Sequence, residues 1–173
     1  MIDVGDFNQQ RRFLRSTPED VERFEVECSN IFHITQLPAG LVEFAMTVGL
    51  GRLKSRFSFS KSRDFTITSF YLLAPTGADS ELRNLGDASL TEDSIIDATR
   101  SHLSNWAREL GENPLYGLLN IGDDRVGGDY FISCRDDDFG TVYFYQSEEY
   151  VLHRVAGSFT EFVEGLEPWT AEQ

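Results

Sequence analysis

A run of three carboxylates, Asp136 to Asp138, is the first place in this chain where residue type and spacing suggest chemistry. Carboxylate oxygens are ligands that Ca²⁺ prefers, and an EF-hand loop opens with closely spaced acids. A frame starting at Asp136 needs an oxygen-bearing side chain at position 5, Gly at position 6 and Glu at position 12. The chain has Gly140, Thr141 and Ser147 there. We therefore predict no metal site and interpret the run as a solvated hairpin turn closed by Gly140.

A second group of acids lies just upstream. Asp123, Asp124 and Asp129 flank a short glycine-containing stretch, and we interpret them as loop and strand-edge acids. Asp129 could form an acid–base pair with Glu148 or Glu149, since such catalysis needs two titratable groups close together. The strand register that decides this is not readable from the sequence, so the pairing stays open.

Side chains that act as nucleophiles, bases or metal ligands are few and scattered. His33, His102 and His153 are the only histidines, and no two have the spacing of a metal site. Cys28 and Cys134 form no CxxC pair, so we expect two reduced, buried thiols. The sequence contains no GxSxG, HExxH, P-loop or GxGxxG motif. We therefore predict that the protein is not an enzyme and has no catalytic residue, metal or cofactor.

The first half of the chain predicts two helices followed by two strands. Thr17 is a good N-cap before Pro18, and apolar residues at helical spacing follow to about Ser29. Leu37-Pro38 opens a second helix, which the glycines after Val48 end. Alternating residues then indicate strands at 52–60 and 65–73.

The second half indicates one long helix, several short strands and a final helix. Ser89 and Glu92 fit a capping box for a helix that ends at Gly111. The last helix starts at Ser158, where Glu161 completes a second capping-box pattern. Between these helices we predict strands at 115–121, 130–133, 141–145 and 150–155.

Short strands joined by tight turns favour an α+β fold. We predict a single domain with a largely antiparallel sheet of five to six strands, flanked by about four helices. The domain spans residues 17–168. Residues 1–16 are polar with scattered apolar positions, so we expect a flexible arm.

The order and spacing of these elements resemble the SUKH superfamily of Smi/Knr-like proteins. The resemblance covers Thr17 to Leu166. It implies a non-enzymatic role: many bacterial members look like immunity proteins that bind and neutralise toxins, often nucleases, and fungal relatives are regulatory scaffolds. The motifs that carry it, after the first capped helix, are Leu37-Pro38 with Phe44, the strand 118–121 leading into Gly128-Asp129-Tyr130-Phe131, the segment Gly140 to Tyr145, and Ser158 to Phe162.

Charge is distributed unevenly. Residues 1–63 carry nine Lys or Arg and eight Asp or Glu, whereas residues 64–173 carry six and 21. An acidic surface repels nucleic acid phosphates and attracts basic proteins. We therefore expect no direct nucleic acid binding. The basic strand 52–63 is either a counterbalance to the acids or a contact for RNA, an anionic ligand or an acidic surface.

These observations predict a cytoplasmic, non-enzymatic immunity protein that occludes a cognate toxin domain or another basic protein. The alternative is an intracellular scaffold or regulator of the Smi/Knr type. The apolar runs are shorter than the roughly 18–20 residues that span a membrane, so we expect no membrane partner. The predicted partner-binding surface consists of Asp136, Asp137, Asp138, Tyr143, Tyr145, Glu148 and Glu149.

Overall fold

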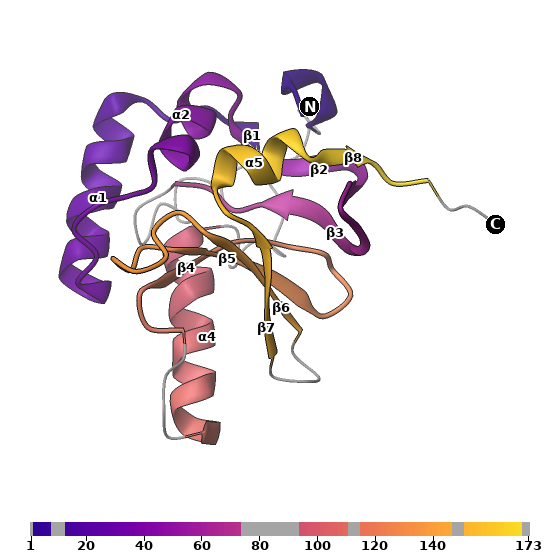
Figure 1. The fold of residues 1–173 in the computed structure, drawn as a ribbon. Helices are drawn as coiled ribbons and strands as arrows, with labels where there is room; N and C mark the ends of the chain where they lie inside the picture. Colours follow the sequence, from indigo (N-terminus) through magenta and orange to yellow (C-terminus); the bar gives the residue numbers. More distant parts are fainter. Residues whose placement is uncertain (1, 8–12, 74–93, 111–114, 147–150, 171–173) are drawn as a thin grey trace, which may run out of the picture.

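The centre of the fold is an antiparallel meander of consecutive strands (Figure 1). The computed structural model describes residues 2–7, 13–73, 94–110, 115–146 and 151–170. Each strand of the meander pairs with the next one, and β1 extends the sheet beyond β2. The strands are β1 (Phe13–Leu14), β2 (Leu50–Phe59), β3 (Ser62–Phe70), β4 (Leu118–Asp123), β5 (Gly128–Ser133), β6 (Val142–Gln146) and β7 (Val151–Ala156).

The fold class is α+β, as predicted, with more strands than the expected five to six. The path β1 to β7 has seven strands, and a further strand, β8 (Leu166–Pro168), pairs with β2. The sequence did not indicate β1 and β8 because they contain only two and three residues. Alternation is recognisable only over about four residues or more.

Two helices at the start of the domain follow the sequence signals closely. α1 (Pro18–Phe32) begins with a capping box, in which the Thr17 hydroxyl accepts from Asp20 N and the Asp20 carboxylate accepts from Thr17 N. It continues past the predicted end near Ser29 and stops at His33, which adopts a left-handed conformation. α2 (Ala39–Thr47) starts after Pro38, as predicted.

One face of the sheet is covered by α2 and α5 (Phe159–Glu164) through a cluster of aromatic rings. Phe159 lies with its ring centroid 5.6 Å from Phe44 and 6.1 Å from Phe70. Phe162 stacks 5.1 Å from Tyr130 of β5, whose hydroxyl donates to the carbonyl of Thr66 at 2.9 Å. The large buried rings thereby fix the sheet against both helices.

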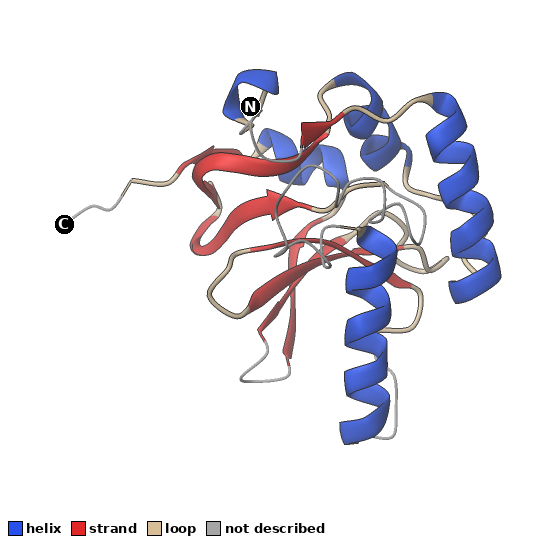
Figure 2. Ribbon diagram, turned by 180° about the vertical axis from the view of Figure 1, so that it is seen from behind, coloured by secondary structure: helices blue, strands red, loops and turns tan. Residues whose placement is uncertain are grey.

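The opposite face carries α4 (Ile95–Leu110), which runs beside β4 and β5 (Figures 1 and 2). Successive residues of β5 point to opposite faces, so Tyr130 packs toward α5 while Phe131 belongs to a smaller cluster under α4. The backbone N–H of Asn120 donates to the Thr99 hydroxyl at 2.8 Å and ties α4 to β4. The predicted cap at Ser89 and Glu92 lies outside the described residues.

Residues near the N-terminus pack into the domain. Ile2 and Phe7 are buried, and Val4–Asp6 form a single 3-10 turn between them, η1. Phe7 bridges Leu53 of β2. This part of the segment 1–16, which we expected to be an arm, therefore contributes to the core.

Candidate functional site

The acidic turn between β5 and β6 is held by one of its own carboxylates. Asp138 accepts hydrogen bonds from the hydroxyl of Ser133 and, at 2.6 Å, from that of Tyr143. Its carbonyl accepts from Thr141 N at 2.9 Å, and Gly140 has the positive φ of 82° that closes the turn. The pKa of Tyr143 is raised, first by burial and then by its bond to Asp138. Asp138 therefore shapes the turn.

The outer side of this turn combines carboxylates with aromatic side chains. Asp136 and Asp137 are exposed, and Phe139 beside them is 39% exposed. Tyr116 is 61% exposed and is brought close by Arg135, whose Nε donates to the Tyr116 carbonyl at 2.7 Å. We call these five residues the acidic turn surface. Aromatic and charged groups on a fixed scaffold are typical of a protein-binding surface.

The two tyrosines of the predicted surface have different environments. Both project from the face of β6 that α4 covers, Tyr143 opposite Phe131 and Tyr145 opposite Asp129. Tyr143 is half-buried, but Tyr145 is only 2% exposed and its ring lies 6.1 Å from His102. Alternation placed Tyr145 on a face of the sheet without showing that a helix covers it. Of the two tyrosines in the predicted partner-binding surface, only Tyr143 is therefore accessible, and Tyr145 is too buried to contact a partner.

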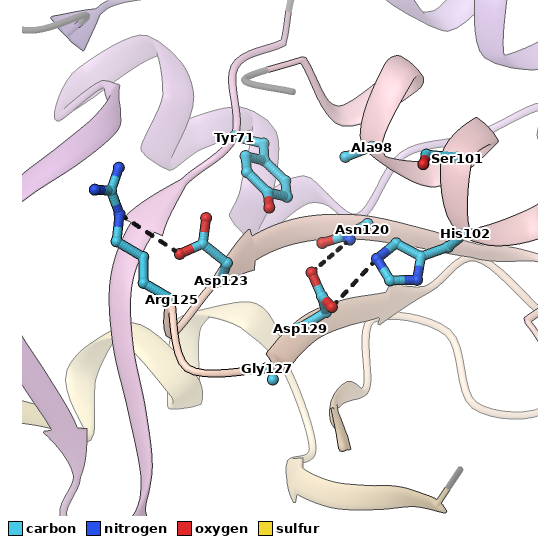
Figure 3. A pocket seen from close by; sticks show the side chains of 10 residues that line it. Tyr71, Ala98, Ser101, His102, Asn120, Asp123, Arg125, Gly127 and Asp129 are labelled. Carbon is cyan, nitrogen blue, oxygen red and sulfur yellow. Dashed lines mark hydrogen bonds and ion pairs between the residues drawn. The ribbon is translucent and has the colours of Figure 1, made fainter. Parts of the chain in front are cut away.

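A cavity of about 460 Å³ lies between α4 and the β4–β5 end of the sheet (Figure 3). α4 supplies one wall, the end of β3 another, and the turn between β4 and β5 the floor. Figure 3 shows the side chains of Tyr71, His102, Asn120, Asp123 and Asp129 around a shared space. The polar lining consists of Tyr71, Ser101, His102, Asn120, Asp123, Arg125 and Asp129.

Asp129 is positioned in this cavity by two neighbouring side chains, His102 and Asn120. His102 Nε2 lies 3.2 Å from one carboxylate oxygen, and Asn120 Nδ2 donates to the other at 3.1 Å. The Asn120 side chain is fixed in turn, because its Oδ1 accepts from Gly122 N at 3.2 Å. A bulge between Asn120 and Gly122 brings this amide to the cavity. The orientation of the Asp129 carboxylate is thereby defined.

Asp123 faces the same space from the end of β4. The Thr68 hydroxyl donates to its carboxylate at 3.0 Å, and the Tyr71 hydroxyl also bonds to it. The nearest described cation, Arg125, places Nε 4.0 Å from the carboxylate and is 44% exposed. Burial raises the pKa of Asp123 above its ordinary value, and these hydrogen bonds only partly offset that effect.

The sequence did not identify this cavity as a site. Asp129 and His102 come from different elements, so their contact depends on how α4 packs against β5. Asn120 carried the one usable signal, because an amide inside the apolar run of β4 needs buried hydrogen-bond partners. Glu148 and Glu149 lie outside the described residues, so their pairing with Asp129 remains a hypothesis.

The described side chains do not assemble a nucleophile. Ser101 precedes His102 in α4, and neighbouring residues of a helix face different directions. Burial raises the pKa of the Cys28 thiol, and raises that of Cys134 to about 12, so both disfavour the reactive thiolate. Among the described residues no group of three or more His, Cys, Asp or Glu is arranged to hold a metal ion.

The cations of the basic strand that the structure describes make contacts within the chain. Lys54 Nζ donates to the carbonyl of Gly5 at 2.6 Å. The Arg56 guanidinium lies 5.3 Å from the ring centroid of Trp169, and Lys61 pairs with Glu161. These contacts favour the interpretation that the strand balances charge within the domain.

Comparisons with known proteins identify the family. No helix in the described part of the chain is long and apolar enough to cross a membrane. Neither curated proteins nor solved structures give a match. Residues 16–165 match the SMI1 / KNR4 family (SUKH-1), a range that includes both the acidic turn surface and the cavity. Because that match covers most of the chain, this protein is a member of the SMI1 / KNR4 family.

Proposed function

We propose that this protein is a cytoplasmic immunity protein that neutralises a cognate bacterial toxin by binding and occluding it. Proteins of its family are generally non-enzymatic and bind other proteins. The toxin domain we propose is of the nuclease type, because the groove of a nuclease must be basic to hold phosphates. An acidic protein can occupy such a groove without chemistry on its partner.

The observation that carries this proposal is the exposed and ordered acidic turn surface. Asp136 and Asp137 project from a turn whose shape is set by the bonds of Asp138 to Ser133 and Tyr143. A preformed surface loses little conformational entropy on binding. The aromatic side chains beside the two carboxylates supply contact area that charge alone lacks.

Long-range electrostatics also favour binding to a basic partner. Residues 64–173, which include the acidic turn surface, carry 21 acids and six basic residues. Complementary charge mainly speeds the encounter of two proteins. We therefore expect fast, salt-dependent association with a basic toxin domain. Tyr143, Glu148 and Glu149 are proposed to extend the contact.

The test is to capture the partner from the native cell, identify it, and measure its association with purified protein across a series of NaCl concentrations. The double variant Asp136→Asn/Asp137→Asn should associate on the order of tenfold more slowly at low salt, with a flatter salt dependence. It should also protect less well against the toxic activity of the captured protein.

The matched control is Glu164→Gln/Glu167→Gln, which removes the same charge from exposed positions at α5 and β8. It should leave the association rate within about twofold of the unmodified protein. Identical kinetics for all three proteins would exclude the acidic turn surface. A captured partner with no toxic activity would favour the scaffold alternative.

A further inference from the structure

The cavity under α4 has no part in the function proposed above. Its two carboxylates come from neighbouring strands and are held in defined orientations by buried groups. Asn120, which orients Asp129, is fully buried, and Tyr71, which bonds to Asp123, is 6% exposed. In Figure 3 both carboxylates and the Tyr71 hydroxyl point toward the same space. The volume of about 460 Å³ is in the usual range of ligand pockets.

Among the described residues, each cavity carboxylate has one basic neighbour, His102 for Asp129 and Arg125 for Asp123. Thr68 and Asn120, which donate to the two carboxylates, are neutral. The Arg125 Nε, at 4.0 Å from Asp123, is too distant for a hydrogen bond. Figure 3 shows its guanidinium extending away from the space between the carboxylates. Each carboxylate can accept about four hydrogen bonds, so both keep acceptor capacity for a ligand.

We propose that this cavity binds the guanidinium group of an arginine side chain presented by the partner protein, an inference that rests on the proposed function. A guanidinium is planar and has five donors, so it can bond to Asp123 and Asp129 together. The Tyr71 ring, which Figure 3 shows bordering the same space, can lie against its face. Two facing carboxylates repel phosphate, and the described residues offer no metal-ligand cluster.

The energetic state of Asp123 supports this assignment. Its pKa is raised because burial disfavours the charged form, and the hydrogen bonds from Thr68 and Tyr71 and the charge of Arg125 offset that cost only in part. An arriving guanidinium can approach Asp123 more closely than Arg125 does, and it adds opposite charge in a partly desolvated place, where charge pairs are stronger than in water. Binding of a guanidinium therefore reduces the cost of keeping the Asp123 carboxylate charged in a buried position.

The cavity and the acidic turn surface are close enough for one partner to use both. They lie at opposite ends of β5, which has six residues. At about 3.3 Å per residue this is roughly 20 Å. An interface of about 800 Å² per partner covers that distance. An arginine at one edge of a basic toxin surface can therefore enter the cavity while other basic residues of that surface contact Asp136 and Asp137.

The first experiment needs no partner. The full 173-residue chain, labelled with ¹⁵N, is titrated with N-acetyl-arginine-N-methylamide and, separately, with its citrulline counterpart, a neutral analogue of nearly the same shape. The arginine compound should bind with a Kd on the order of millimolar, as a ligand of this size allows. It should shift the amide signals of Gly127 and Gly128, which border the cavity. The citrulline compound should bind at least tenfold more weakly.

Two single variants remove one carboxylate each from the cavity, and a double variant removes two from the acidic turn surface. Asp129→Asn, which keeps the shape and can still bond to Asn120, should weaken arginine binding at least tenfold, as should Asp123→Asn. The control Asp136→Asn/Asp137→Asn should leave probe affinity within twofold, because the acidic turn surface is outside the cavity. Equal binding of both probes, or shifts located at the turn, would overturn the inference.

A further variant tests the cavity without changing either carboxylate. Ser101 is exposed on α4 at the cavity wall, so Ser101→Arg places a guanidinium there without disturbing the core. This variant should retain a dispersed spectrum and lose probe binding. Ser101→Gln, of similar size and without charge, should keep at least half of the affinity. Equal loss in both would show that blockage, not charge, accounts for the effect, and would contradict the proposal.

The captured partner separates this inference from the proposed function. Asp129→Asn should speed dissociation from the partner at least tenfold, while Asp136→Asn/Asp137→Asn mainly slows association. If the probe binds the cavity but Asp129→Asn leaves partner dissociation unchanged, the partner does not use the cavity and the inference fails, while the immunity role stands. If the partner has no toxic activity but depends on Asp129, the immunity role fails and the arginine site remains.

Discussion

At the scale of single residues, equal side chains acquire different roles from their surroundings. Asp136 is exposed on a turn, whereas Asp138 two positions later accepts two side-chain hydrogen bonds. Asp123 is mostly buried beside neutral donors. The sequence identified these acids as candidate functional residues. It could not show which of them are exposed and which are buried, because burial and hydrogen-bond partners depend on tertiary packing.

Asp123 leads to a prediction about pH. Its folded-state pKa is raised, so its charged form destabilises the folded protein at neutral pH. This cost is fully present above the folded pKa and disappears as the pH falls below the pKa of the unfolded chain. We therefore expect Asp123→Asn to increase the free energy of unfolding at pH 7. The gain should shrink as the pH is lowered through the folded pKa of Asp123.

Urea denaturation between pH 3 and pH 8 measures this difference. Asp136→Asn is the control, since it removes one negative charge from the same acidic protein at an exposed position. A gain in stability that is the same for both variants would trace the effect to net charge. A loss of stability in Asp123→Asn would contradict the assignment.

At the scale of elements, the β5–β6 turn depends on one side chain. Asp138→Ala removes the acceptor of the Ser133 and Tyr143 hydroxyls. We expect a loss of about 1–3 kcal/mol in the free energy of unfolding, because the half-buried donors lose their partner. Denaturant titration measures it. Asp137→Ala, on the exposed side of the same turn, should stay within about 0.5 kcal/mol. Equal losses would mean that the turn does not depend on Asp138.

Elements with a local signal were predictable, and elements made by tertiary pairing were not. Thr17 and Pro18 predicted the start of α1 because capping is a local interaction. In contrast, β1 exists because Phe13 and Leu14 lie beside Gly51 and Leu50, a pairing that no local pattern shows. The cavity belongs to the second kind. It requires α4, β4 and β5 in their final places, so only Asn120 hinted at it.

At the scale of the whole molecule, stability is concentrated in the aromatic cluster between the sheet and α5. Phe162 is fully buried and packs against Phe59, Phe70 and Tyr130. Phe162→Ala should reduce the free energy of unfolding by about 3–5 kcal/mol through lost contacts and the space left behind. Denaturant unfolding measures the loss, and the exposed Phe139→Ala should change it by less than about 0.5 kcal/mol. A loss below about 1 kcal/mol for Phe162→Ala would contradict this placement of the core.

The pairing of β8 with β2 has a consequence for synthesis on the ribosome. Phe59 of β2 pairs with Leu166 of β8, and this pairing can form only after the segment between them has been translated. At about 5–20 residues per second this takes on the order of ten seconds. Throughout that interval the phenylalanines of β2 lack their final neighbours and present apolar surface to the cell. The nascent chain is therefore a candidate client for chaperones until its last strand emerges.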